Sequence, residues 1–155
     1  MESSDYWFMT LPGSWLELEI QCRVERPNRT SLVVLENRAE QDCLVKYITD
    51  EFNSVSGVRY AIGLQSPDHY RGVYQWRPSD TTPTFTNWAS ASPTNKECVV
   101  MTVGSGASQN GAWTDVSCQM DTKGELHHYL LSNSLSLQIN FLNLTTQEDI
   151  GKFPP

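Results

Sequence analysis

The stretch from residue 95 to residue 118 constrains the fold of this chain most strongly. Cys98 opens one run of strand-forming residues and Cys118 closes another, and residues 104–111 between them are rich in glycine, serine and asparagine. Such a composition is typical of a turn. Two strands that fold back on each other would bring the cysteines close enough for a disulfide bond, with Asp115 at the edge of the loop. The pattern therefore predicts a stapled hairpin that presents a surface, and not a buried catalytic cleft.

A helix is predicted near the start of the chain. Ser14 is followed three residues later by Glu17, which is the sequence signature of a capping box at a helix N-terminus. Apolar residues then recur at helical spacing, at Trp15, Leu18 and Cys22. These three side chains are expected to face the core.

The rest of the chain divides into a second helix and a loop-rich half. The helix is predicted over residues 39–52, with Cys43 beside Leu44 on its apolar side. A short aromatic strand over residues 6–10 is expected to precede both helices. From Tyr60 onward the helical spacing disappears and glycine, proline, serine, threonine and asparagine dominate. This change is typical of a multi-stranded segment with long loops.

The aromatic residues of this half have two interpretations. Trp76, Trp88 and Trp113 are of a kind that stacks on sugar rings, but large aromatic side chains more often lie in a core, where each buries a large area. We expect Trp88 and Trp113 in the core, and Tyr70 and Tyr74 at the surface.

Several short motifs, in their order and spacing, resemble the C-type lectin-like domain. Residues 14–22 are similar to the first helix of that family and its first cysteine, and residues 31–37 to the strand and turn before the second helix. Further segments match the family in order: Ala61-Ile62-Gly63-Leu64 (Trp-Ile-Gly-Leu in the family), Gln75-Trp76, Phe85-Thr86-Asn87-Trp88, and Trp113-Thr114-Asp115 (Trp-Asn-Asp in the family). The resemblance covers residues 5–124. It implies an α+β fold in which two helices flank small antiparallel sheets beside a long irregular loop region.

The resemblance also implies a ligand-binding surface. In calcium-dependent members, carboxylate and amide oxygens hold a Ca²⁺ ion, which takes about six to eight oxygen ligands, and sugar hydroxyls complete the shell. The corresponding candidate carbohydrate- or ligand-binding residues here are Ser92, Thr94, Asn95, Glu97, Thr114 and Asp115. Hydroxyls at Ser92 and Thr94 replace a carboxylate and an amide, which leaves Glu97 and Asp115 as candidate metal ligands. Ca²⁺ is a candidate cofactor of this degenerate site, but the weakened ligand set favours a chain that binds none.

The family pattern pairs Cys98 with Cys118 and leaves Cys22 without its usual partner, because no cysteine follows Cys118. Three states are open for Cys22: a disulfide with Cys43, an intermolecular bridge, or a buried thiol outside any disulfide. We favour the buried thiol.

Composition argues against several classes of function. The formal charge of −7 would repel a phosphate backbone, so nucleic-acid binding is not expected. No apolar run reaches the length of about 18 residues that a membrane span needs. No nucleophile elbow, His-Glu-x-x-His motif or phosphate loop is present, so the chain is not expected to be an enzyme.

The expected location is extracellular or at the cell surface, as the resemblance implies. The N-terminal residues lack the basic and apolar regions of a signal peptide, which is expected of a removed leader or of an incomplete or variant chain. Asn28 and Asn143 each begin a glycosylation sequon.

The last thirty residues depart from the family pattern. A final strand with a cysteine near position 127 is expected, where the chain instead reads Glu125-Leu126-His127-His128-Tyr129. We therefore predict a domain over residues 5–124 that lacks its final strand and last cysteine, and an atypical tail over residues 125–155, as in a splice or gene-model variant. The edge of the strand at residues 6–10 would then be unpaired, unless the alternating run 135–141 supplies a substitute.

The predicted function is extracellular recognition of a glycan or a protein ligand by a lectin-like domain with a degenerate calcium site. The alternative is a non-sugar protein-interaction module, or a truncated isoform that lacks a functional ligand site.

Overall fold

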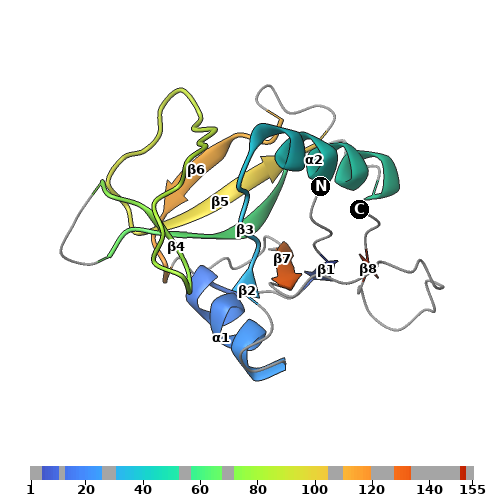
Figure 1. Cartoon of the computed structure of the whole chain (residues 1–155), viewed down its shortest axis with the longest axis horizontal. Helices are drawn as coiled ribbons and strands as arrows, with labels where there is room; N and C mark the ends of the chain where they lie inside the picture. Colours follow the sequence, from blue (N-terminus) through green and yellow to red (C-terminus); the bar gives the residue numbers. More distant parts are fainter. Residues whose placement is uncertain are drawn as a thin grey trace.

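The computed structural model describes residues 5–10, 13–25, 31–52, 57–67, 72–104, 110–119, 128–133 and 151–152. The elements follow one another in this order: β1 (Asp5–Thr10), α1 (Trp15–Glu25), β2 (Ser31–Leu32), α2 (Arg38–Phe52), β3 (Val58–Gln65), β4 (Gln75–Trp76), β5 (Cys98–Val103), β6 (Trp113–Val116), β7 (His128–Asn133) and β8 (Gly151–Lys152). The two helices, the sheet and the long segment between β4 and β5 confirm the predicted fold class (Figure 1).

The described strands form one sheet in the order β6-β5-β3-β7-β1-β8, with β2 added to β7 and β4 added to β3. Neighbouring strands run antiparallel except β3 and β7, which pair in parallel through Tyr60 with His128 and Ala61 with Tyr129. The hairpin of β5 and β6 therefore lies at one edge of the sheet, beside the long loop.

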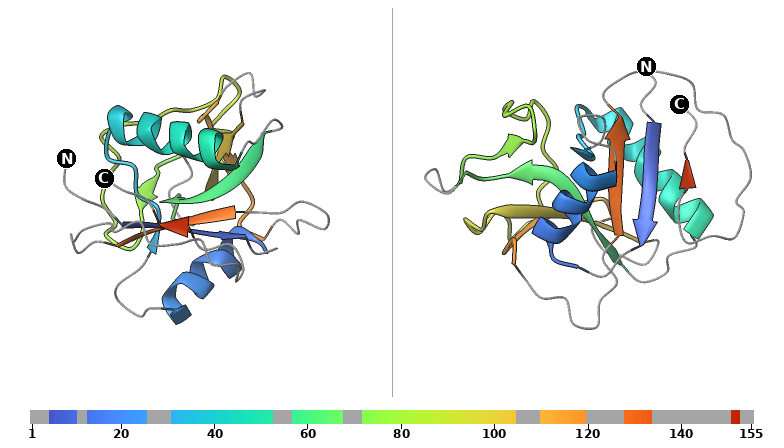
Figure 2. Two further views of the ribbon diagram at one scale, coloured as in Figure 1. Left: turned by 90° about the vertical axis from the view of Figure 1, so that its right-hand side faces the viewer. Right: turned by 90° about the horizontal axis from the view of Figure 1, so that it is seen from below.

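The two helices lie on opposite sides of this sheet (Figure 2). Successive side chains of a strand point to opposite faces, so β3, β5 and β6 each supply both cores. The larger core lies under α2 and contains Tyr60, Ile62, Leu64, Val99, Met101 and Trp113. The smaller core lies under α1 and contains Ala61, Cys98, Val100 and Val116. Burial on both faces explains why β3 and β5 are almost continuously apolar.

The start of α1 confirms the predicted capping box. The Ser14 backbone N–H donates to Glu17 Oε2 at 2.7 Å, and the Glu17 N–H donates to Ser14 Oγ at 3.3 Å. Trp15, Leu18 and Cys22 are buried, as their spacing predicts. The Trp15 indole Nε1 also donates to the carbonyl of Ile62 at 2.9 Å, which fixes α1 against β3.

The second helix, α2, buries Leu44 and Ile48 but not its cysteine. Cys43 is exposed, so the expectation that it lies on the apolar side is wrong. Residues one apart on a helix do not share a face, and the side chain two positions earlier, Gln41, is the one that faces inward. Cys22 lies on the buried face of α1 and forms no disulfide with Cys43.

The aromatic core is centred on Trp113, which is fully buried. Its ring meets Trp76, Phe85 and Trp88 edge to face, with centroids 5.5–5.9 Å apart. Its Nε1 donates to Gln41 Oε1 at 2.7 Å. Trp113 confirms the expected core position, and Trp88 packs against the core while half-buried.

The C-terminal part of the chain corrects one expectation. Strand β7 pairs with β1 along its whole length, from Asp5 opposite Asn133 to Thr10 opposite His128. The predicted loss of the final strand, with an unpaired β1 edge, is therefore wrong. Backbone hydrogen bonds hold this strand in the sheet, and these do not require the missing cysteine. The run 135–141 lies outside the described residues, and the division into a domain and a tail stays a prediction.

Candidate ligand-binding loop

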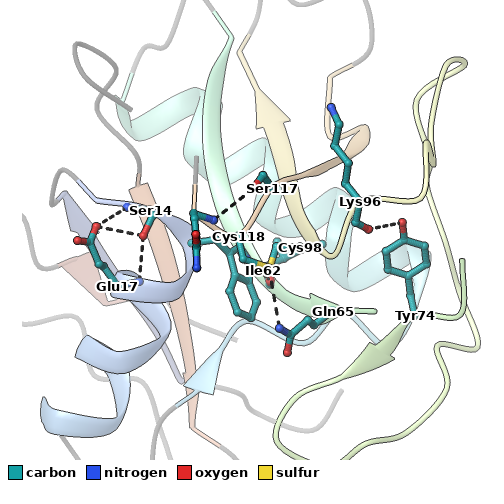
Figure 3. The surroundings of a disulfide bond; sticks show 11 residues. Ser14, Glu17, Ile62, Gln65, Tyr74, Lys96, Cys98, Ser117 and Cys118 are labelled. Carbon is teal, nitrogen blue, oxygen red and sulfur yellow. Dashed lines mark hydrogen bonds between the residues drawn. A yellow bond between two sulfur atoms is a disulfide. The ribbon is translucent and has the colours of Figure 1, made fainter. Parts of the chain in front are cut away.

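The hairpin of β5 and β6 carries the predicted disulfide. Cys98 at the start of β5 is bonded to Cys118, two residues past the end of β6, with Cα atoms 5.1 Å apart (Figure 3). Both sulfurs lie at the smaller core under α1. The bridge thus ties the two ends of the hairpin at the point where the long loop enters β5.

The candidate loop, residues 92–97, precedes β5 directly. Thr94, Asn95 and Lys96 are exposed, and Ser92 and Glu97 are partly exposed. Asn95 adopts a left-handed backbone conformation with φ 67°, which asparagine tolerates better than most residues. The loop therefore presents a sharp turn to solvent, with Asn95 at its apex.

Asp115 lies behind this turn and not in front of it. Its side chain is only 1% exposed. Oδ2 accepts hydrogen bonds from the backbone N–H of Thr94 at 2.7 Å, the hydroxyl of Thr94 at 3.0 Å and the backbone N–H of Lys96 at 2.8 Å. A ligand in solvent therefore meets the loop, while the carboxylate holds the loop from inside.

These hydrogen bonds decide the charge state of Asp115. Burial alone would raise the pKa of its carboxyl group, because a low-dielectric environment disfavours the charged form. The donors on Lys96 and Thr94 favour the charged form and outweigh burial, so the pKa is lowered from its ordinary value. Asp115 is an ionised, internally bonded carboxylate at neutral pH.

Tyr74 holds the same turn from inside, beside Asp115. Its hydroxyl donates to the carbonyl of Lys96 at 2.8 Å (Figure 3) and lies 3.4 Å from Asp115 Oδ2. Tyr74 is buried, so the expectation of a surface position is wrong. Burial first, and the charge of Asp115 second, raise the pKa of Tyr74 to about 12. Sequence reasoning missed this residue, since the partner that buries its hydroxyl is a backbone carbonyl 22 residues away.

The other candidate residues are not all brought together. Thr114 is adjacent to Asp115 on β6, and adjacent side chains of a strand point to opposite faces. Thr114 is partly exposed, and it shares its face with Val116 of the smaller core. Glu97 lies close enough to Tyr74 for its charge to add to the raised pKa there. Tyr70, Asn28 and Asn143 lie outside the described residues.

The arrangement does not fit a calcium ion. Four hydrogen-bond donors already face Asp115 Oδ2, from the backbone and hydroxyl of Thr94, the backbone of Lys96 and the hydroxyl of Tyr74, and a cation there would meet their positive ends. The second oxygen, Oδ1, is buried without a hydrogen-bond partner among the described residues. One such oxygen is far from the roughly six to eight that calcium takes. Within the described ranges no group of three or more His, Cys, Asp or Glu side chains could hold a metal ion.

Comparison with known proteins identifies the family. Residues 12–123 match the profile of the Lectin C-type domain, which is most of the chain. The chain belongs to the C-type lectin domain family. A curated relative, the C-type lectin mosGCTL-7 of Aedes aegypti, is 31% identical over 94 residues, or 57% of this chain. The aligned region spans 61% of the length of that relative.

Solved C-type lectin domains share the fold. The C-type lectin CEL-I from Cucumaria echinata aligns with a TM-score of 0.62 at 19% identity, over 82% of this chain and 89% of its own. Human lithostathine aligns with a TM-score of 0.65 at 18% sequence identity, over 86% of this chain and 84% of its own. The Ca²⁺-independent C-type lectin SPL-2 from Saxidomus purpuratus aligns with a TM-score of 0.64 at 20% sequence identity, over 83% of this chain and 85% of its own. At these identities the likeness concerns the fold of the lectin domain.

Among the helices that the structure describes, none is long and apolar enough to cross a membrane.

Proposed function

We propose that this C-type lectin domain recognises a glycan or a protein ligand outside the cell through the loop at residues 92–97. The observation that carries the proposal is the exposed turn at Asn95, which is anchored from inside by Asp115 and Tyr74. A surface fixed before binding loses less conformational entropy when the ligand arrives. The fold and the disulfide support an extracellular binding role, since disulfides persist in oxidising compartments.

The ligand-facing groups are those of the apex and its neighbours. Asn95 offers an amide, which both donates and accepts hydrogen bonds, and Lys96 offers an ammonium group. Hydroxyl-rich ligands such as sugars are bound by such planar and charged polar groups. Glu97, Ser92 and Thr94 flank the apex, and Thr94 already donates its hydroxyl proton to Asp115.

A glycan array tests the proposal, run on the folded chain with and without a chelator. The informative variant is Asn95→Gly, because glycine keeps the left-handed backbone and removes only the side chain. We expect the variant to lose binding to whichever glycans the wild type retains. Thr82→Ala, an exposed change elsewhere in the long loop, is the matched control and should bind as the wild type does. Unchanged binding by Asn95→Gly would contradict the assignment of the apex.

A protein-interaction module is the second candidate, and one feature favours it. Leu16, Ile20 and Val24 recur every four residues along α1, with exposed fractions of 38%, 50% and 66%. Apolar residues aligned on an exposed helix face are typical of contact surfaces. Ile20→Lys should leave glycan binding intact. If the wild type binds a protein ligand but no glycan, and Ile20→Lys no longer binds that protein, the second candidate is favoured.

A further inference from the structure

The backbone on both sides of the loop apex is held by one carboxylate oxygen. The N–H groups of Thr94 and Lys96 converge on Asp115 Oδ2 at 2.7 and 2.8 Å, and the Thr94 hydroxyl adds a third donor at 3.0 Å. Hydrogen bonds to an ionised carboxylate are shorter and stronger than neutral ones. Asn95, the residue between the two N–H groups, is thereby fixed at φ 67°.

A second contact locks the same turn. The Tyr74 hydroxyl donates to the carbonyl of Lys96 at 2.8 Å, so both backbone polar groups of Lys96 are bonded to the interior. The Lys96 ammonium group extends away from Tyr74, as Figure 3 shows. The turn therefore directs the backbone of Lys96 inward and its side chain outward.

This bonding competes with metal binding at Oδ2. A calcium ion on Oδ2 would need the lone pairs that Thr94 and Lys96 now occupy and would face their N–H groups, which leaves Asp115 only Oδ1 to offer. Of the side-chain oxygens in the loop, the Thr94 hydroxyl is already a donor to Asp115. The chain therefore keeps the acidic residue of the family motif but surrounds it with donors.

We propose that the Asp115 carboxylate takes the place of a bound metal ion, holding residues 94–96 in the ligand-binding conformation so that recognition needs no calcium. Asp115 is a positioning residue in this scheme, because it acts through the loop and touches no ligand. The inference rests on the proposed function for the identity of the binding loop, but the holding of the loop is measurable without any ligand.

The hydrogen bonds that residues 94 and 96 form with Asp115 and Tyr74 are called the clamp below. Amide hydrogen exchange, resolved to single residues by NMR, measures the strength of the clamp directly. In the wild type, we expect the N–H groups of Thr94 and Lys96 to be protected to the same extent in a chelator and in millimolar CaCl₂. The melting temperature should also be equal in the two buffers, since a bound ion would raise it. A gain in protection or in melting temperature with calcium would overturn the inference.

Asp115→Asn supplies the matching variant, because it keeps the size of the side chain and removes its charge. Exchange at Thr94 and Lys96 should rise by about ten- to a hundredfold, as the loss of hydrogen bonds to a charged group predicts. The N–H groups within β5 should stay protected, which separates local loosening from global unfolding. Asp80→Asn, an exposed acid in the same long loop that pairs with Arg77, is the control and should leave exchange unchanged.

Two further outcomes are informative. If Asp115→Asn does not fold, Tyr74→Phe removes only one hydroxyl group and should raise exchange at Lys96 by a smaller factor. Unchanged exchange at Thr94 and Lys96 in both variants would overturn the clamp. If the clamp behaves as expected but Asn95→Gly binds ligands normally, the clamp stands and the proposed binding loop fails, so the two failures are distinguishable.

Discussion

At the scale of single residues, Tyr74 is the side chain whose chemistry the fold changes most clearly. Burial and the nearby charge of Asp115 raise its pKa to about 12, whereas an ordinary tyrosine titrates near about 10. The folded state thus favours the protonated phenol. This contribution to stability is complete below about pH 10 and is lost as the pH rises through about 12.

Absorbance titration of tyrosinate should therefore show a late ionisation step that belongs to Tyr74. Tyr74→Phe should remove that late step and leave the earlier ones in place. Loss of the step in Tyr47→Phe instead would contradict the assignment, although burial raises the pKa of Tyr47 as well. The two variants together assign the titration.

The same cluster shows what the sequence can predict about a site. Asp115 and the loop at residues 92–97 could be identified because they align with family motifs. The inward direction of the carboxylate could not, since it depends on backbone donors 21 and 19 residues earlier in the chain. The burial of Tyr74 could not be predicted either, because its hydrogen-bond partner is a backbone carbonyl far away in the sequence. A tyrosine bonded to such a carbonyl and one bonded to solvent have the same local sequence pattern.

At the scale of elements, the sequence predicted the two helices well, because capping residues and apolar spacing are local signals that act within each helix. The capping box and the apolar spacing predicted α1, and the spacing of Leu44 and Ile48 predicted α2 within one residue of its start. Cys43 was misplaced because its neighbour in sequence, Leu44, is buried, and one step along a helix rotates a side chain by about 100°. Helical spacing predicts a face, but the boundary of that face depends on what packs against it.

Gly63 in β3 shows an element whose packing leaves no room for a side chain. Its N–H donates to the carbonyl of Val33 at 2.8 Å, and its own carbonyl accepts from the N–H of Arg77 at 2.8 Å. An added Cβ atom would lie 2.9 Å from the Leu32 carbonyl oxygen, 3.2 Å from that of Val33 and 3.3 Å from that of Arg77. All three are backbone atoms, so no side-chain rotation relieves the contact.

Gly63→Ala should therefore lower the free energy of unfolding by about 3 kcal/mol, at the upper end for overpacking. Gly13→Ala is the matched control, because the nearest atom to its added Cβ is Glu17 Oε2 at 3.2 Å, at the end of a flexible side chain. The control should cost less than about 1 kcal/mol. Urea denaturation measures both, and equal losses would show that β3 can shift to accept a methyl group.

At the scale of the whole molecule, β7 connects the N-terminal strand to the rest of the sheet. It lies between β3 and β1, and β2 also pairs with it. β1 has β7 as its inner neighbour and the two-residue β8 as its outer one. The sequence did not predict this strand because the expectation depended on a missing cysteine, whereas the pairing depends on backbone groups that every residue carries.

Deletion of residues 125–155 should abolish cooperative unfolding, since it removes β7 and leaves the hydrogen-bonding edges of β1, β2 and β3 open. Exposed edges of this kind favour association, so the shortened chain is also expected to aggregate. Deletion of residues 134–155 is the control: it keeps β7 and removes β8, which among the described residues pairs with Trp7 and Phe8 of β1. Tryptophan fluorescence during thermal unfolding, combined with light scattering, compares the two chains. The longer chain should keep a single sharp transition. A sharp transition in the shorter chain as well would show that the two helices and the sheet from β3 to β6 fold without the strand that now joins them to β1.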